Sequence, residues 1–150
     1  MKAKRAKMFP TPDDASTAFY DAFERADLQA MMSVWAESDS VVCVHPRGPR
    51  LVGHDSVRDS WAQIFAAGGR LRVVTTDTCT FEGPSIAVQT VVEMVSAQGS
   101  TDEPTPVCAT NVFELTEGGW RLVIHHASPM MVPEAPEPED EEPSTGHVLH

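Results

Sequence analysis

A histidine ends the first apolar segment of the chain, where its imidazole could do acid–base chemistry. The segment VVCVHPRGPR, residues 41–50, is apolar as far as His45 and then breaks at a proline and a glycine. Both residues favour turns, so His45 could simply be the last residue before solvent. Alternatively, an imidazole at the mouth of a buried strand can act as a base or a metal ligand near neutral pH.

Residues that could lie near His45 raise two further possibilities, thiol chemistry and metal binding. Cys43 lies two positions earlier on the same strand, which predicts side chains about 7 Å apart, side by side and not hydrogen-bonded. We therefore interpret Cys43 as a reduced, buried residue and not as a nucleophile. His45, His125 and Asp77 could supply three ligands to zinc, but no H-x-x-x-H or C-x-x-C pair accompanies them. We expect no metal and no cofactor.

Two adjacent histidines near the end of the apolar sequence cannot both face the interior. His125 and His126 lie on one predicted strand, so their side chains point to opposite faces of the sheet. The turn at residues 117–119 decides between them. A three-residue loop would put His125 on the face of Asn111, whereas a two-residue loop would put His126 there. Two glycines favour the three-residue loop, which predicts that His125 faces inward.

Three segments in the first half of the chain have helical periodicity. Residues 11–26 begin with a threonine cap, a proline and two aspartates, and apolar residues then recur at helical spacing. Asp27 can cap a second, short helix. A third helix is expected from residue 55 to residue 67, where two glycines end it.

The second half of the chain has the pattern of strands. Four β-branched, partly alternating segments are separated by turn residues: residues 70–81, 85–97, 106–116 and 120–131. Helices followed by such a meander predict an α+β fold, with three N-terminal helices packed on one face of a curved, mostly antiparallel sheet. Because the helices only partly fill the concave side of such a sheet, we expect a pocket there.

Length, charge and hydropathy limit the class of protein. A chain of 150 residues has the size of one domain, which we place at residues 9–131. Residues 1–8 are interpreted as a flexible basic terminus, and residues 132–150 as a disordered, acidic, Pro/Glu-rich tail. The net charge of −11 argues against binding nucleic acid. No apolar run approaches the roughly 20 residues that span a membrane, and no signal peptide is recognisable, so we expect a cytoplasmic protein with no membrane partner.

The chain resembles the SnoaL-like proteins of the nuclear transport factor 2-like superfamily over residues 13–131. Three segments carry the resemblance: FYDAFERADLQAMMSVWAESDSVV, HPRGPRLVGHDSVRDSWAQIF and TNVFELTEGGWRLVIHHASP. The resemblance implies a cone-shaped, cystatin-like α+β fold. This fold hosts isomerases, lyases, cyclases, hydrolases and assembly domains, so it does not by itself identify an activity.

The ketosteroid isomerases of this superfamily imply roles for three residues. Tyr20 falls where these enzymes keep a tyrosine that donates to the developing oxyanion. His45, directly before Pro46, falls where they keep an aspartate general base, and Asn111 falls where they keep a protonated aspartic acid. Imidazole can take a proton and an amide can donate a hydrogen bond. The resemblance therefore implies His45 as base, with Tyr20 and Asn111 as catalytic hydrogen-bond donors.

Four further residues are expected to line the pocket: His125, Trp61, Arg47 and Phe113. Arg47 and Arg50 flank the His-Pro turn, where they could clamp an anionic substrate or simply lie in a solvated loop. Trp61 could instead be only a packing anchor, as large aromatic residues usually are.

These observations predict a homodimeric domain that binds a small organic molecule and can catalyse proton-transfer isomerisation or elimination. A second resemblance, to the calcium/calmodulin-dependent kinase II association domain, favours a non-catalytic ligand-sensing or oligomerisation domain. The anion-binding arginines of that domain are not preserved here. With the three-residue turn, an apolar strip for dimerisation would form on the outer face of the sheet from five residues: Thr110, Val112, Trp120, Leu122 and Ile124.

Overall fold

The structure, a computed structural model, describes residues 7–131. The predicted acidic tail and residues 1–6 of the predicted basic terminus lie outside the described residues. Helices and strands follow in the order α1 (Pro12–Arg25), α2 (Leu28–Val34), β1 (Val42–Val44), β2 (Arg50–Val52), α3 (His54–Ala66), β3 (Leu71–Glu82), β4 (Ile86–Ala97), β5 (Thr105–Thr116) and β6 (Gly119–Pro129). No helix in this part of the chain has the length and apolar character needed to cross a membrane.

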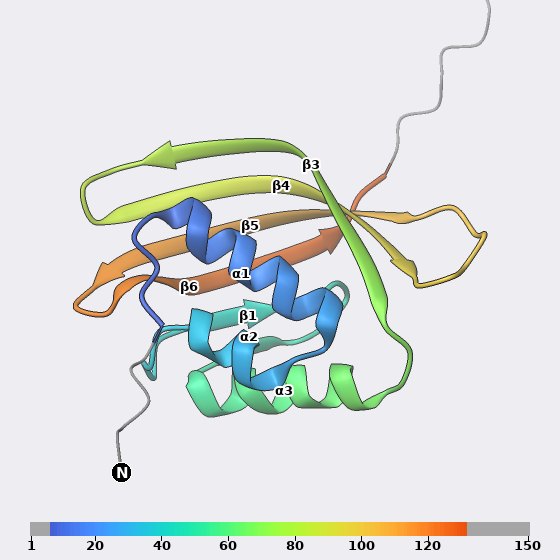
Figure 1. The fold of residues 1–150 in the computed structure, drawn as a ribbon, viewed down its shortest axis with the longest axis horizontal. Coiled ribbons are helices and arrows are strands. Elements are labelled where there is room, and N and C mark those ends of the chain that lie inside the picture. The colour runs from blue at the N-terminus through green and yellow to red at the C-terminus, as the bar shows by residue number, and fades with distance from the viewer. Residues whose placement is uncertain (1–6, 132–150) are drawn as a thin grey trace, which may run out of the picture.

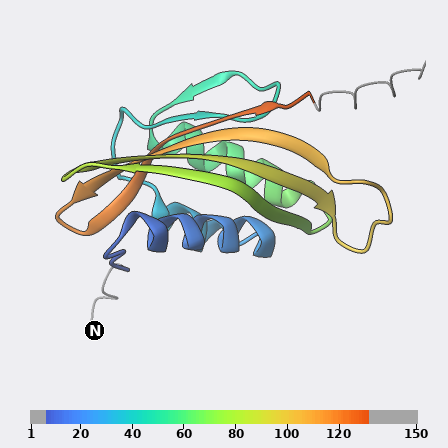
Figure 2. The same cartoon turned by 90° about the horizontal axis from the view of Figure 1, so that it is seen from above.

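All six strands belong to one curved sheet, in the order β2-β1-β6-β5-β4-β3. Strands β3 to β6 form the predicted antiparallel meander, and β1 joins it by parallel pairing with β6. Residues 50–52, which the sequence pattern predicts as part of a turn, form β2 instead and pair with β1. Three residues directly after a proline are too few to show the alternation of a strand. The views in Figures 1 and 2 place α1 along the inner face of the sheet, and the predicted α+β fold is confirmed.

Aromatic side chains hold the helices against the sheet. Phe19 of α1 and Trp61 of α3 are both fully buried, and their rings meet edge to face with centroids 5.7 Å apart. Trp35, which follows α2, and Trp120 of β6 are also buried in the same core. Large buried aromatic residues dominate the packing energy of a small core, so this cluster fixes where α1 and α3 lie over the sheet.

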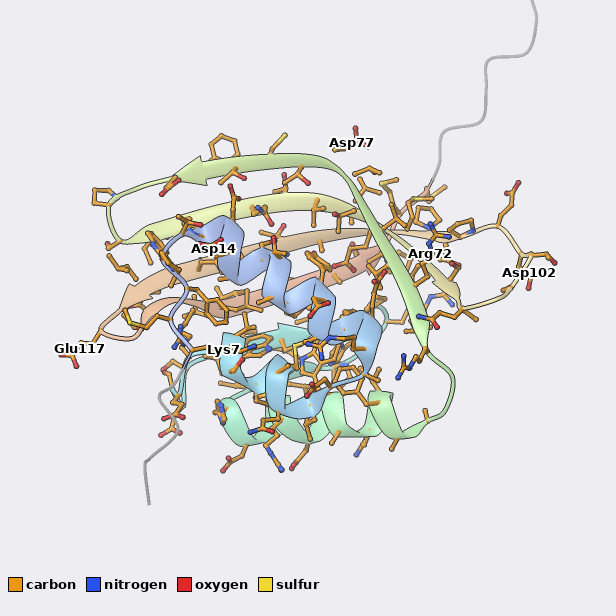
Figure 3. The ribbon with its side chains drawn as sticks, viewed as in Figure 1. Lys7, Asp14, Arg72, Asp77, Asp102 and Glu117 are labelled. Carbon is orange, nitrogen blue, oxygen red and sulfur yellow. The ribbon has the colours of Figure 1, made fainter. Side chains whose placement is uncertain are left out.

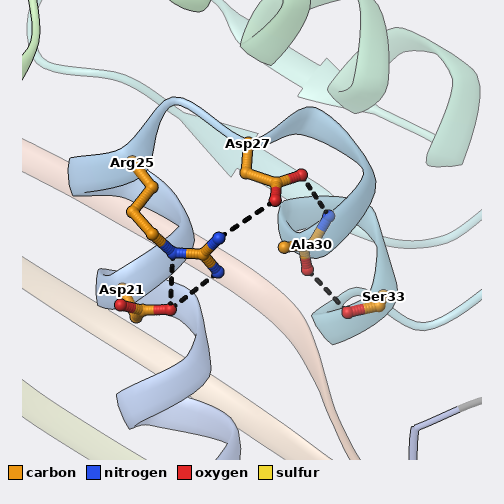
Figure 4. A network of polar contacts seen from close by, with 5 residues as sticks. All are labelled: Asp21, Arg25, Asp27, Ala30 and Ser33. Atoms are coloured by element: carbon orange, nitrogen blue, oxygen red, sulfur yellow. Dashed lines mark hydrogen bonds and ion pairs between the residues drawn. The ribbon is translucent and has the colours of Figure 1, made fainter.

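The sharp turn from α1 into α2 is held by a short polar network (Figure 4). Arg25 bonds the carboxylates of Asp21 and Asp27, while Asp27 caps α2 by accepting a hydrogen bond from the backbone N–H of Ala30. Ala26 ends α1 in the left-handed conformation, with a φ of 51°. Exposed ion pairs of this kind contribute at most about 1 kcal/mol. The backbone N–H of Ala26, which bonds the carbonyls of Ala22 and Phe23, and the cap by Asp27 therefore also stabilise the turn.

The hairpin between β5 and β6 differs from the predicted three-residue turn. Thr116 pairs with Gly119, so the loop has two residues, Glu117 and Gly118. The register then shifts between Val112 and Phe113 because Val123 is an extra residue in β6, a β-bulge. The sequence predicts Trp120 and Leu122 on the outer face of the sheet. Both lie before the bulge, and in the structure they face the core. After the bulge the faces exchange, which turns Ile124 outward and the next residue inward.

Gly119 lets the chain before α1 pack on the β5–β6 hairpin. Phe9 pairs with Gly119 in an isolated parallel bridge, and its carbonyl accepts a hydrogen bond from the backbone N–H of Trp120. Gly119 has a φ of 96°, and a Cβ at this position would lie 2.8 Å from the carbonyl oxygen of Phe9. Only glycine combines this backbone conformation with this close approach.

We therefore expect Gly119→Ala to lower the free energy of unfolding by about 2 kcal/mol or more, since the new methyl group meets backbone that cannot move aside. Gly118→Ala is the matched control, because its Cβ would meet side chains only, the flexible Arg121 and, at an ordinary contact distance, Thr116. Urea unfolding followed by circular dichroism measures both variants. Equal losses in the two variants would contradict the importance of the Phe9 contact.

Candidate functional site

A cavity of about 460 Å³ opens between the inner face of the sheet and the ends of α1 and α3. Its walls are largely apolar and include Phe23, Ile64, Leu71, Val95 and Val107. The polar residues of the lining include His45, Glu93 and His125, together with Ser96, Ser100, Asp102, Glu103 and Thr105. A concave apolar space with a few convergent polar groups is the usual form of a small-molecule site.

His45 lies directly after β1, half-buried, with its imidazole edge-on to Trp61 at a centroid distance of 4.8 Å. Its Nε2 is 3.0 Å from the hydroxyl oxygen of Ser60, and that hydroxyl donates to the backbone carbonyl of Val57 at 2.7 Å. Because the Ser60 proton is already used, Nε2–H donates to Ser60 and the neutral ring carries its free lone pair on Nδ1. Burial lowers the pKa of His45, which keeps the imidazole in this basic form at neutral pH.

Cys43 lies closer to His45 than strand geometry predicts. Its Sγ is 3.6 Å from Nε2 of the imidazole, where the sequence predicts about 7 Å. The prediction fails because His45 lies one residue beyond β1, so the alternation of a strand no longer separates the two side chains. Burial, together with the charge of Glu93, raises the pKa of the Cys43 thiol to about 12. The thiol therefore stays protonated, and it is a weak nucleophile in that form.

Four buried or half-buried side chains from α1, β4, β5 and β6 form one chain of hydrogen bonds. Nδ1–H of His125 donates to the amide oxygen of Asn111 at 2.6 Å. The amide nitrogen of Asn111 donates to the Tyr20 hydroxyl at 2.9 Å, and this hydroxyl donates to Glu93 at 2.7 Å. Each partner therefore fixes the orientation of the next, and the chain connects two of the polar side chains that enter the cavity.

The structure places His125 on the inner face, as the sequence analysis favours, although for a different reason. His125 pairs with Asn111 because of the bulge at Val123, not because of the length of the turn. It is 1% exposed, and burial lowers its pKa to about 3, with smaller contributions from the charges of His45 and His126. His125 is therefore a neutral imidazole whose Nδ1 is occupied by Asn111.

Glu93 is the pocket residue that the sequence analysis does not identify. Its side chain is 2% exposed, and burial raises its pKa to about 7 against the opposing effect of the hydrogen bond from Tyr20. A carboxyl group in this environment exists in both protonation states near neutral pH. The alternation in VQTVVEMV, residues 88–95, could have revealed it, because Gln89, Val91 and Glu93 share one face of β4 and are all buried.

Tyr20 and Asn111 stand next to the cavity and are not among the residues that line it. Their donors serve the network: the Tyr20 hydroxyl bonds Glu93, and the Asn111 amide bonds Tyr20. Burial, and then the charge of Glu93, raise the pKa of Tyr20 above its ordinary value. The structure thus brings Tyr20 and Asn111 together, with His125 between Asn111 and the cavity, while His45 approaches from the other side through a contact of 6.5 Å between imidazole centroids.

Three other predicted pocket residues do not line this cavity. Trp61 and Phe113 are fully buried in the hydrophobic core, where neighbouring side chains cover them. Arg47 is exposed in the turn after His45, with a φ of 62°. Asp77 is exposed at the register shift of β3, and Figure 3 shows it at the margin of the sheet. Within residues 7–131, no three His, Cys, Asp or Glu side chains are placed to hold a metal ion.

Comparison with known proteins agrees with the fold. A proposed calcium/calmodulin-dependent protein kinase type II association domain from Thiobacillus denitrificans is 38% identical, with a TM-score of 0.77 over 83% of this chain and 98% of that chain. A proposed dehydratase of the NTF2-like family from Streptomyces avermitilis is 34% identical, with a TM-score of 0.71 over 81% of this chain and 100% of that chain.

A curated relative and a family model complete the comparison. The F-box protein SKIP8 of Arabidopsis thaliana is 32% identical over 119 residues, which cover 78% of this chain and 48% of that protein. The chain therefore spans about half the length of this curated relative. The model of the SnoaL-like domain matches residues 13–133. The helices, the curved sheet and this match together show that the chain belongs to the SnoaL-like domain family of the NTF2-like superfamily.

Proposed function

We propose that this domain binds a small organic molecule in the cavity and catalyses proton transfer, as an isomerisation or an elimination, with His45 as the base. The observation that carries the proposal is the placement of a neutral imidazole, with a free lone pair on Nδ1, in the same apolar cavity as a buried carboxyl group. The dehydratase description of the Streptomyces avermitilis protein supports it, because dehydration is an elimination.

The surroundings of His45 suit general-base catalysis. Ser60 holds Nε2–H, so the basic Nδ1 is the nitrogen left for a substrate proton. The depressed pKa leaves the base unprotonated at neutral pH, and an oriented base of this kind contributes about 10²–10⁴ to a rate. Glu93 binds the polar end of the ligand, while Tyr20 and Asn111 act as positioning residues that hold Glu93 and His125.

The domain should catalyse the elimination of 5-nitrobenzisoxazole, in which a base takes the ring C–H proton as the N–O bond opens to a cyanophenolate. We expect His45→Ala and His45→Gln to lower kcat/KM by about 100-fold, because both remove the base while glutamine still offers a donor to Ser60. The absorbance of the phenolate follows the reaction.

His126→Ala is the matched control for this experiment. His126 is the neighbouring histidine of β6, is exposed on the opposite face and has no place at the cavity. Its loss should leave kcat/KM unchanged. If both His45 variants kept the wild-type rate while circular dichroism showed them folded, His45 would not be the base.

The protonation of Glu93 should appear in the stability of the protein. Burial raises the pKa of this carboxyl from 4.5 to about 7, so the folded state holds the proton more tightly than the unfolded state. Its contribution is complete below about pH 4.5 and is lost as the pH rises through about 7. Over this window the unfolding free energy of the wild type should fall by about 3 kcal/mol relative to Glu93→Gln.

Urea unfolding of the two proteins between about pH 4 and pH 8 measures this difference. His125 titrates with the opposite sign, but it is present in both proteins and cancels in the comparison. A difference between the two proteins that does not change with pH would rule out the raised pKa of Glu93.

A second candidate function, assembly through the outer face of the sheet, is favoured by an uncharged area in the middle of that face. Within the described chain, the outward residues in the middle of β4, β5 and β6 include no Lys, Arg, Asp or Glu: Val88, Thr90, Val92, Met94, Cys108, Thr110, Val112 and Ile124. Exposed Glu114, which pairs with Ile86, marks one end of this area. Exposed Val74 and Phe81 extend this surface on β3. An uncharged apolar face is complementary to a second copy of itself, so we propose a homodimer.

Light scattering should give twice the chain mass of 16.3 kDa for the wild type at micromolar concentration. Val92→Arg should give the single mass, because it buries an unpaired charge in the centre of the proposed interface. Gln98→Arg, in the loop after β4, adds the same charge away from this face and should remain dimeric. A wild-type monomer would exclude assembly and leave the proposed catalysis standing.

A further inference from the structure

We propose that the ligand of this cavity is a primary ammonium compound with an apolar body. The inference rests on the proposed function in one respect, namely that the cavity is the ligand site. Three observations support it: the hydrogen-bond acceptors that the polar side chains leave free, the negative charge of the side chains around the cavity, and its apolar walls.

Of the polar residues that line the cavity, His45, Glu93 and His125 present hydrogen-bond acceptors, while Ser96, Ser100 and Thr105 add hydroxyl groups that can donate or accept. Nε2–H of His45 is used by Ser60 and Nδ1–H of His125 is used by Asn111, so each neutral ring has only a lone pair left. Glu93 accepts from Tyr20 through one oxygen and has a second oxygen free. A ligand with several N–H donors on a single atom, as in an ammonium group, satisfies the acceptors of Glu93 and His125 together and leaves Nδ1 of His45 for the substrate proton.

The side chains that carry these acceptors all line the cavity. Among the described residues, the Nε1 atoms of Trp35 and Trp61 are the only buried side-chain nitrogen or oxygen atoms that lack both a hydrogen-bond partner and contact with solvent. The free nitrogen of His125 is not among these atoms. This nitrogen therefore keeps some contact with solvent, although the residue as a whole is only 1% exposed. His125 and Glu93 both line the cavity, so a ligand bound there lies next to these side chains.

The charged side chains around the cavity are all acidic. Besides Glu93, the lining includes Asp102 and Glu103 from the loop between β4 and β5, and no Lys or Arg of residues 7–131 belongs to it. Figure 3 shows Asp102 at the tip of that loop. Arg72 is exposed on β3 and is not a lining residue. Such a field attracts cations and repels carboxylates and phosphates, which argues against the anionic substrate that Arg47 and Arg50 suggest.

Apolar walls require an apolar body on the ligand. Phe23, Ile64 and Leu71 come from three different elements, and Val95 and Val107 complete the surface. A volume of about 460 Å³ accommodates one or two fused rings beside the ammonium group. The ring of Phe23 is also suited to lie beside a cation.

Binding of an ammonium group should release protons. Near neutral pH part of the protein has a protonated Glu93, and the ligand requires the carboxylate. The groups that face Glu93 are Tyr20 from α1, Cys43 and His45 at the end of β1, and His125 on β6, with Asp102 and Glu103 at the rim. Tyr20 and Cys43 have raised pKa values and His45 and His125 have lowered ones, so all four are neutral and Glu93 is the group that titrates.

The test uses four probes of one shape: 2-naphthylmethylamine, its N,N,N-trimethyl derivative, 2-naphthylmethanol and 2-naphthoate. Isothermal titration at pH 6.5 in two buffers of different ionisation enthalpy gives both the affinity and the protons released. We expect the primary amine to bind at least tenfold more tightly than each of the other three, with net proton release. Equal or tighter binding of any other probe would overturn the proposal.

Glu93→Gln localises the effect. The substitution keeps the shape and the acceptor for the Tyr20 hydroxyl, so the fold is retained. We expect at least a tenfold loss of affinity for the amine, no proton release and unchanged binding of the alcohol. Glu103→Gln is the matched control at the rim and should cost less than threefold. Loss of amine affinity in the rim variant alone would overturn the role of Glu93.

Failure of this inference can be separated from failure of the proposed function. If 5-nitrobenzisoxazole is converted in a His45-dependent way but the amine binds no better than the alcohol, the ammonium preference is wrong and the proposed function stands. If none of the four probes binds and the elimination does not depend on His45, the cavity is not the ligand site and both fail.

Discussion

The buried carboxyl group of Glu93 is the constraint around which this domain is organised. A carboxyl group inside an apolar sheet face is costly unless it is protonated or well hydrogen-bonded. The fold meets this requirement with a hydroxyl from α1 and holds that hydroxyl in turn with an amide from β5. Helix, sheet and cavity are therefore joined by polar contacts as well as by aromatic packing. Buried networks of this kind specify a unique arrangement, because any slip leaves several groups unsatisfied at once.

The same network explains why the two histidines have different characters. His125 is fixed through Asn111 and is almost fully buried at the wall of the cavity, and burial lowers its pKa to about 3, so it is a neutral acceptor at neutral pH. His45 is only half-buried and is fixed from the opposite side by Ser60. It keeps access to the cavity and to solvent, as a base that exchanges protons must. Two chemically identical side chains thus acquire separate tasks from their partners and their burial.

Much of this architecture is predictable from the amino-acid pattern, and the exceptions have physical reasons. The three helices and the meander follow from strong periodicity, and His45 follows from its place after a valine run. The edge strand β2 is too short to produce a pattern, and pairing between β1 and β6 joins segments about eighty residues apart. Glu93 looks like an ordinary charged residue until its neighbours on the strand are known to be buried. Tyr20 and Asn111 are adjacent as the family resemblance implies, yet only coordinates reveal that their donors are turned toward each other and toward Glu93.

The bulge at Val123 has a consequence for how this site could change during evolution. One extra residue in β6 sets which side chains of the following segment enter the cavity, while the hairpin turn and the core before it keep their own register. Loss or gain of a single codon at this point would exchange His125 for an adjacent side chain and rewrite the floor of the cavity in one step. Substitutions elsewhere would have to replace each inward residue separately. A backbone irregularity of this kind gives a family with one fold a short mutational route between different pocket chemistries.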